Sequence, residues 1–262
     1  MKLGLLLSAV AALSIGGAAF YAKAAPAAKT LASMSVAQKR AAIGGAWNRY
    51  PEIDQPLIPG LKPAAPIPPP PLKQPYKAEW EATQKKQAEM IKNGQPIFNN
   101  YARCIGDGMP AMMQGMFPME ILQTPGQITI IQEAYNQVRR VQMGAKQGEM
   151  GDTEPTFGGH AVGHWEGDTL VLDTIAVKDN VHFRETPHSD HMRISERIKL
   201  IRPDILQNEV TVTDPMYLDG AWKWTWIYTR KPGYTLYEYV CEDNRQYQDP
   251  TTGGTRLKIG GN

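Results

Sequence analysis

The sequence predicts a mostly β protein with minor α content, an antiparallel β-barrel or strongly curved sheet preceded by an N-terminal helix and a proline-rich arm. Three observations favour this fold. From about Asn99 to Asn244, short runs of alternating apolar and polar residues are separated by turn signals, as in all-β domains. About nine or ten such runs occur with local connections, which suits a barrel. Before them lies a proline-free run rich in Ala, Glu, Lys and Gln, which is typical of a helix.

The first 24 residues predict a cleavable secretory signal peptide. Met1 and Lys2 are followed by an apolar stretch over Leu3–Phe20 and by the A-x-A site Ala22–Ala24, the usual order in such signals. We therefore expect a periplasmic or secreted protein that keeps no stable membrane anchor after processing. A retained N-terminal anchor is the alternative.

Residues 25–98 predict an arm in front of a barrel domain over residues 99–262. Ser35 is a plausible N-cap of a short helix within Ser35–Asn48, which two glycines end early. Pro51–Pro75 holds many prolines, four of them in a row, so it should form an extended arm or linker. Tyr76–Asn93 carries a narrow apolar stripe, and we expect a helix that lies on the barrel.

Charge and cysteine content limit the partners and suggest a covalent link. The net charge is +2, charged residues make up 21% of the chain, and Lys and Arg are scattered, so no nucleic-acid partner is expected. The two cysteines are Cys104 and Cys241, and an even number in an exported chain favours a disulfide over two buried thiols. The bridge would close a loop of 241 − 104 = 137 positions.

The β region begins after a group of methionines. They are Met109, Met112, Met113, Met116 and Met119. With no histidine nearby, they favour adaptable packing over a copper site. Strands are then expected over 120–124, 127–133 and 137–143, and the polar loop 144–157 could cover an opening.

The stretch Gly159–Thr174 predicts the central hairpin of the domain. If Glu166 and Gly167 form its turn, His160 faces Asp173 across the two strands. A histidine beside a carboxylate is either an acid/base pair or part of a solvated sheet face. Both interpretations stay open at this point.

The next strand places a carboxylate among aliphatic side chains. After a long loop over 178–190 that contains His182 and His188, the alternation in Met192–Leu200 puts Glu196 on the apolar face. Its ionised form should be disfavoured unless a cation or hydrogen-bond donors meet it. Glu196 is therefore either a proton-transfer group or half of a structural pair with an arginine.

An aromatic stripe follows in the strand over 221–230. Trp222, Trp224, Trp226 and Tyr228 share one face, either as core or as a substrate-binding wall. We expect at least one tryptophan to line a pocket with His160 or Glu196, and the others to pack outward beneath the helix. Residues 234–241 should form the last strand, and the polar tail should be frayed.

Motifs for bound metals and cofactors are weak. His160 and His164 would lie about 13 Å apart on one strand, too far to share an ion. His188, Asp190 and His191 could hold a metal at a loop junction, but we expect neither a metal nor a cofactor. No serine-hydrolase elbow, dinucleotide fingerprint or P-loop occurs in the sequence.

Several segments resemble a family of exported bacterial proteins, most of which have no assigned function. They are C-x-x-x-G-M-P from Cys104, E-I-x-Q-T-P-G from Glu120, W-E-G-D-T-L-V-x-D-T from Trp165, H-S-D from His188 and Y-V-C-E from Tyr239. The resemblance implies a compact barrel of the lipocalin-like, or calycin, kind and implies no activity. His160, Asp173, His188 and Glu196 match its pattern, whereas His164 and His191 depart from it.

Two functions fit these residues. The first is a cofactor-independent lyase, isomerase or hydratase that acts on a hydrophobic or aromatic small molecule, with His160 and His188 exchanging protons, Asp173 orienting His160 and Glu196 as a second acid. The second is a binding protein for an apolar small ligand, without turnover. Convergence of the two histidines and Glu196 on one cavity would favour the enzyme, and separation would favour binding. The sequence predicts no oligomeric state.

Overall fold

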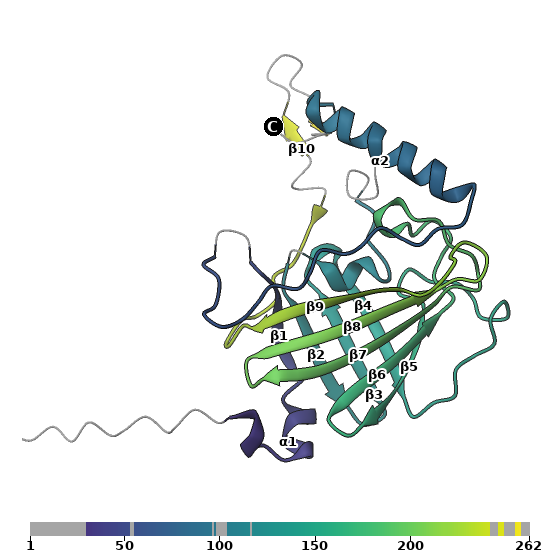
Figure 1. Cartoon of the computed structure of the whole chain (residues 1–262). Coiled ribbons are helices and arrows are strands. Elements are labelled where there is room, and N and C mark those ends of the chain that lie inside the picture. Colours follow the sequence, from purple (N-terminus) through teal and green to yellow (C-terminus); the bar gives the residue numbers. More distant parts are fainter. Residues whose placement is uncertain are drawn as a thin grey trace, which may run out of the picture.

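The computed structural model is a closed β-barrel of nine strands, which confirms the predicted fold class (Figure 1). It describes residues 30–52, 55–95, 97, 104–115, 117–241, 246–248 and 255–257. The predicted signal peptide and Met116 lie outside these residues. The barrel strands are β1 (Gly45–Tyr50), β2 (Met119–Thr124), β3 (Gln127–Gln132), β4 (Gln137–Met143), β5 (His160–Glu166), β6 (Thr169–Ile175), β7 (Arg193–Arg202), β8 (Ile205–Thr213) and β9 (Trp222–Arg230).

The barrel closes through a strand that the sequence analysis missed. β1 pairs with β9 on one side and with β2 on the other, although its residues were expected to end a helix and begin an arm. Gly45, at φ 109°, turns the chain directly from the helix into the strand. The predicted strand over 234–241 is wrong, since that segment has no strand pairing. The tail, expected to be frayed, contains the paired strands β10 (Gln246–Gln248) and β11 (Thr255–Leu257).

One seam of the barrel is parallel, which corrects the expectation of a purely antiparallel sheet. Eight of the nine strand pairs are antiparallel. β4 and β5 run parallel and pair only from Val141 with Ala161 to Met143 with Gly163. The long connection between them, residues 144–159, allows this geometry, because a parallel pair cannot be joined by a tight turn.

The two α-helices differ from each other in their relation to the barrel. α1 (Val36–Ala41) begins at the predicted cap, where Ser35 and Gln38 form a capping box. α2 (Tyr76–Lys92) has no buried residue and lies largely apart from the barrel wall in Figure 1, although Tyr76 and Trp80 near its start pack partly against the core cluster. Trp80 Nε1 donates to the carbonyl of Arg184 at 2.9 Å, so α2 contacts a loop over the barrel and does not cover the tryptophan stripe.

Of the two forms predicted for the proline-rich segment, the structure shows an arm that packs along the barrel. Ile58 and Leu61 pack against a small outer cluster that contains Tyr50, and Tyr50 OH donates to the carbonyl of Leu61 at 3.1 Å. Further on, the carbonyl of Pro68 accepts from Trp222 Nε1 at 2.8 Å. The arm therefore fixes both the outside of β1 and the barrel end at Trp222.

The core fills the barrel interior. Trp222, Trp224, Trp226 and Tyr228 point inward and are buried. This corrects the expectation that some of the tryptophans pack outward. The methionines at 109, 112, 113 and 119 are buried in the same cluster, which agrees with their expected role in packing. The predicted disulfide is present between Cys104 and Cys241.

Candidate functional site

The central hairpin has a different register from the predicted one. Its turn is Gly167–Asp168, so His160 faces Ile175 and Asp173 faces Val162. Gly167 takes φ 60°, a conformation that glycine adopts without strain, and this moves the turn by one residue. The predicted pairing of His160 with Asp173 is therefore wrong.

Both members of that expected pair lie on the outer face of the barrel with other partners. His160 is exposed, and its Nε2 lies 2.9 Å from the carbonyl of Glu154. Asp173 accepts from Arg193 at 2.7 and 2.8 Å. An arginine clamps the carboxylate, so it does not orient the imidazole.

Glu196 lies deep in the barrel in a polar cluster. It is 0% exposed and pairs with Arg139, itself 1% exposed, at 2.5 Å. Asn208 Nδ2 donates to its other oxygen at 2.8 Å, and Arg139 also donates to Thr174 at 2.8 Å. Glu196 was expected to be either a proton-transfer group or half of a structural pair with an arginine, and the structure shows the pair with an arginine.

This interior cluster leaves several donors and one acceptor, Asn208 Oδ1, without a hydrogen-bond partner among the described residues. Within the described residues, Arg139 Nε and Nη1 and the indole nitrogens of Trp224 and Trp226 have no hydrogen-bond partner. Arg49 lies over the Trp226 ring at 5.8 Å, and burial lowers the pKa of its guanidinium. Burial raises the pKa of Tyr228, which keeps its hydroxyl protonated as a donor to the carbonyl of Met113 at 2.6 Å. The guanidinium group of Arg139 thus pairs with Glu196, whereas that of Arg49 lies over the Trp226 ring.

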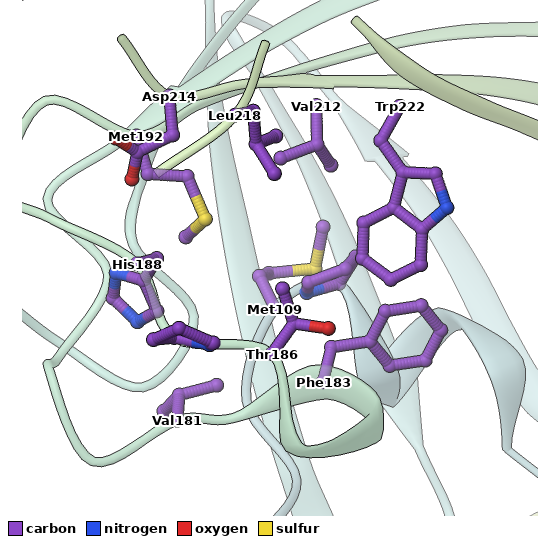
Figure 2. Close-up of a pocket in the computed structure, with 12 residues that line it drawn as sticks. Met109, Val181, Phe183, Thr186, His188, Met192, Val212, Asp214, Leu218 and Trp222 are labelled. Carbon is purple, nitrogen blue, oxygen red and sulfur yellow. The ribbon is translucent and has the colours of Figure 1, made fainter. Parts of the chain in front are cut away.

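A pocket lies at the barrel end that Trp222 occupies (Figure 2). We call it the mouth pocket. It is lined by Met109, Pro110, Val181, Phe183, Thr186, Pro187, His188, Met192, Val212, Asp214, Leu218 and Trp222, and its volume is about 20 Å³. Most of these side chains are apolar. The hydroxyl of Thr186 is buried and has no hydrogen-bond partner among the described residues.

Phe183 closes the mouth of the barrel from the loop between β6 and β7. Its ring centroid lies 5.6 Å from that of Trp222, 5.3 Å from Trp224 and 6.2 Å from Trp226. Phe183 thus adds a fifth ring to the four aromatic side chains of the β9 stripe, and sequence reasoning missed it. The only signal was an aromatic residue within a polar loop.

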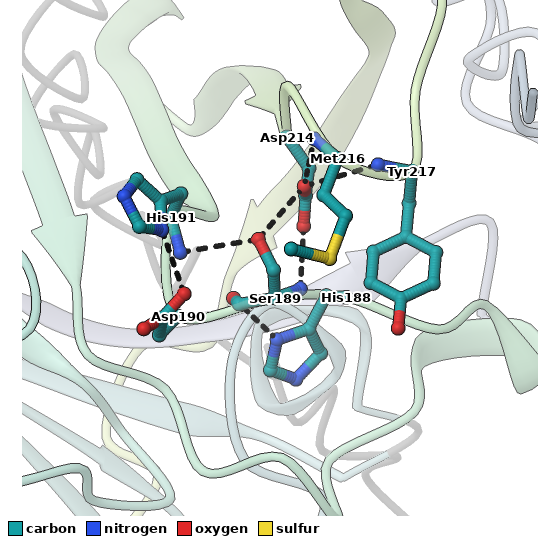
Figure 3. A network of polar contacts seen from close by, with 7 residues as sticks. All are labelled: His188, Ser189, Asp190, His191, Asp214, Met216 and Tyr217. Atoms are coloured by element: carbon teal, nitrogen blue, oxygen red, sulfur yellow. Dashed lines mark hydrogen bonds and ion pairs between the residues drawn. The ribbon is translucent and has the colours of Figure 1, made fainter.

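His188 is held at the mouth pocket by a network centred on Asp214 (Figure 3). The Asp214 carboxylate accepts from Ser189 N at 2.6 Å, Ser189 Oγ at 2.9 Å and Met216 N at 2.9 Å. The imidazole of His188 faces two backbone carbonyls, those of Ser189 at 3.1 Å and Lys178 at 3.0 Å. Because the Ser189 hydroxyl donates to Asp214, these residues do not form a Ser-His-Asp nucleophile.

The remaining histidines have separate places. His164 pairs with Glu166 at 3.2 Å and His191 with Asp190 at 2.6 Å, both on the surface. His182 lies beside His188, with ring centroids 6.4 Å apart. In the part of the chain that the structure describes, no group of three or more His, Cys, Asp or Glu side chains has the geometry of a metal site.

A second and larger cavity lies at the parallel seam between β4 and β5. Its volume is about 590 Å³, and His160 and Arg139 both belong to its wall. We call it the seam groove. The predicted loop over 144–157 contributes Ala145, Lys146, Gln147, Gly148, Thr153, Thr156 and Phe157 to this wall. The loop therefore covers this groove at the seam.

The predicted site residues therefore do not meet in one cavity. His160 lines the seam groove, His188 and Trp222 line the mouth pocket, and Glu196 is enclosed in the barrel. Arg139 was missed as a site residue, although it shares a face with Val141 in the alternation of β4 and could have been recognised as a buried charge.

Scans of the chain against models of protein families and against curated proteins give no match. The resemblance to exported bacterial proteins thus stays an expectation from the sequence motifs. Among the described residues, no helix is both long and apolar enough to cross a membrane.

Proposed function

We propose that this protein binds a small, largely apolar aromatic molecule at the mouth pocket and does not transform it. The observation that carries this proposal is the composition of the pocket, where aromatic and aliphatic side chains surround the unpartnered hydroxyl of Thr186. Ligand sites are typically apolar with a few polar groups that fix orientation. A hydroxyl or carbonyl group of the ligand would pair with Thr186.

The separation of the acid/base candidates favours binding over catalysis. General acid/base chemistry needs its groups within hydrogen-bond reach of one substrate. His160, His188 and Glu196 lie in three environments, and Glu196 is already paired with Arg139. The lyase, isomerase or hydratase hypothesis loses its shared site, so the binding hypothesis is the better supported.

The ligand gains its space by replacing the ring of Phe183. A pocket of about 20 Å³ holds roughly one water molecule, so an aromatic ligand requires a side chain to move. Exposing a buried Phe costs about 1.5–3 kcal/mol. A ligand ring that takes the place of Phe183 on Trp222 and Trp224 restores the same contacts. The free energy of exchanging one ring for the other is therefore close to zero, and any further contacts of the ligand favour binding.

The loop that carries Phe183 is strained in the closed state. Arg184 and Glu185 follow the ring at φ 54° and 59°, a region that costs non-glycine residues of order 1 kcal/mol each. Trp80 and Gln84 of α2 hold this conformation through the carbonyl of Arg184, at 2.9 and 3.4 Å. Opening the loop releases the strain, which favours displacement of the ring.

Substitution of Phe183 tests the proposal. With the neutral fluorophore N-phenylnaphthylamine as probe, Phe183→Ala should bind about tenfold or more tightly than wild type, because a buried ring contributes more than the 1.4 kcal/mol that tenfold represents. Phe117→Ala, which removes an exposed ring elsewhere, is the control and should bind as wild type does. The double variant Phe183→Ala/Trp222→Ala should lose the gain in affinity for the probe.

Equal binding by Phe183→Ala and Phe117→Ala would overturn the proposal. Incubation of the purified protein with an extract of small molecules separates binding from catalysis. A compound that is consumed, and not merely retained, would restore the enzyme hypothesis.

A further inference from the structure

The seam groove exists because two parallel strands diverge. β4 pairs with β3 from Gln137 onward, but its register with β5 begins only at Val141. The edge of residues 137–140 is therefore open toward the chain before β5. Gln147 pins the covering loop, because its Nε2 donates to the carbonyls of His160 at 3.2 Å and Asp173 at 2.9 Å. The loop held by Gln147 thus encloses the space beside β4 and forms a groove with a defined wall.

The wall of the groove carries cations and no acidic side chain. Arg140 and Lys146 are exposed in it, and no ion pair with another described residue engages either one. The carboxylates of the covering loop, Glu149, Asp152 and Glu154, lie outside the wall. Two unpaired positive charges thus face the same cavity.

A buried cation lies behind these two. Arg139 belongs to the wall as well as to the interior cluster and is 1% exposed, with its Nε and Nη1 atoms unpartnered. Glu196 compensates the charge of Arg139, so Arg139 contributes to the inner side of the groove two N–H donors without a partner among the described residues and no net charge. Apolar side chains complete the wall, among them Val138, Phe157 and Val162.

We propose that the seam groove binds a small organic carboxylate. Arg140 and Lys146 contact the carboxylate, and Phe157 and Val138 cover the organic body. The volume of about 590 Å³ falls within the range of about 300–1,000 Å³ of small-molecule sites. The mouth pocket and the seam groove share no lining residue, so this inference is independent of the function proposed above.

The experiment compares naphthoate with its neutral isostere naphthamide by titration calorimetry on the full mature chain. Naphthoate should bind and naphthamide should bind at least tenfold more weakly, because charge-assisted hydrogen bonds are the strong ones. Lys146→Gln and Arg140→Gln should each weaken naphthoate binding roughly three- to tenfold. Lys223→Gln, which removes the same charge on an exposed position of β9, is the matched control and should leave binding unchanged.

Amide NMR signals locate the ligand. Those of Gly148, Gly158 and Gly159 in the groove wall should shift with naphthoate, and the shifts should be lost in the double variant Arg140→Gln/Lys146→Gln. The proposal is overturned if naphthamide binds as tightly as naphthoate, if inorganic phosphate binds as tightly, if Lys223→Gln weakens binding as much as Lys146→Gln, or if naphthoate does not bind.

Discussion

Removal of Glu196 should destabilise the barrel strongly, because it would leave Arg139 charged and buried. In Glu196→Leu the guanidinium loses the 2.5 Å ion pair and keeps its bond to Thr174, while Asn208 loses its acceptor. Breaking a fully buried pair costs about 3–5 kcal/mol. For a domain of this size each kcal/mol lowers the Tm by about 2–4 °C, so we expect a drop of roughly 6–20 °C.

A double-mutant cycle measured by urea unfolding checks this reasoning. Arg139→Met alone should also be destabilising, whereas Arg139→Met/Glu196→Leu should recover most of the loss, because no uncompensated charge is left in the barrel. If the losses of the two single variants simply add in the double variant, the charges do not interact, and the account of the interior cluster is refuted.

Three further predictions concern other parts of the barrel. The disulfide Cys104–Cys241 closes a loop of 137 positions, so its reduction should lower the free energy of unfolding by about 4–5 kcal/mol in the chain-entropy model. An unchanged midpoint of urea unfolding in the presence of reductant would contradict this prediction. Gly163→Ala should lower the free energy of unfolding by about 1–3 kcal/mol through overpacking, because a Cβ atom there would lie 2.9 Å from three neighbouring side chains. A Tm equal to that of wild type would contradict this prediction. Burial raises the pKa of Glu52, but hydrogen bonding from Lys231 outweighs it and lowers that pKa below 4.5. Lys231→Gln should therefore lower the Tm above pH 4.5, and the difference in Tm from wild type should vanish at lower pH as the Glu52 carboxylate becomes protonated. A difference in Tm that does not depend on pH would exclude the Lys231–Glu52 pair as its cause.

The parts of the fold that follow from local pattern were predictable. Strong alternation located β7 and β9 to within two residues, and the two strands of the β2–β3 hairpin were predicted to within one residue. β1 was not predictable from its own residues, because Gly45–Tyr50 is short and follows a capped helix. Its strand conformation depends on pairing with β9 and β2, which lie far away in the chain and supply the hydrogen bonds.

The predicted side-chain positions at the candidate site depended on the register of the β5–β6 hairpin. An error of one residue in the position of its turn changed which residues face each other. Moving the turn from Glu166–Gly167 to Gly167–Asp168 separated His160 from Asp173. The turn is fixed in part by α1, since Lys39 pairs with Asp168 at 2.9 Å. A tertiary contact of this kind has no signal in the hairpin sequence itself.

At the parallel seam only part of β4 pairs with β5. An antiparallel neighbour would satisfy the backbone of β4 along its full length, but here the register with β5 covers three residue pairs. Arg139 lies just before the part of β4 that pairs with β5, and its pairing with Glu196 links β4 to β7 across the interior. Because Glu196 compensates the charge of Arg139 inside the barrel, the exposed charges of Arg140 and Lys146 are the ones that a carboxylate in the groove would meet.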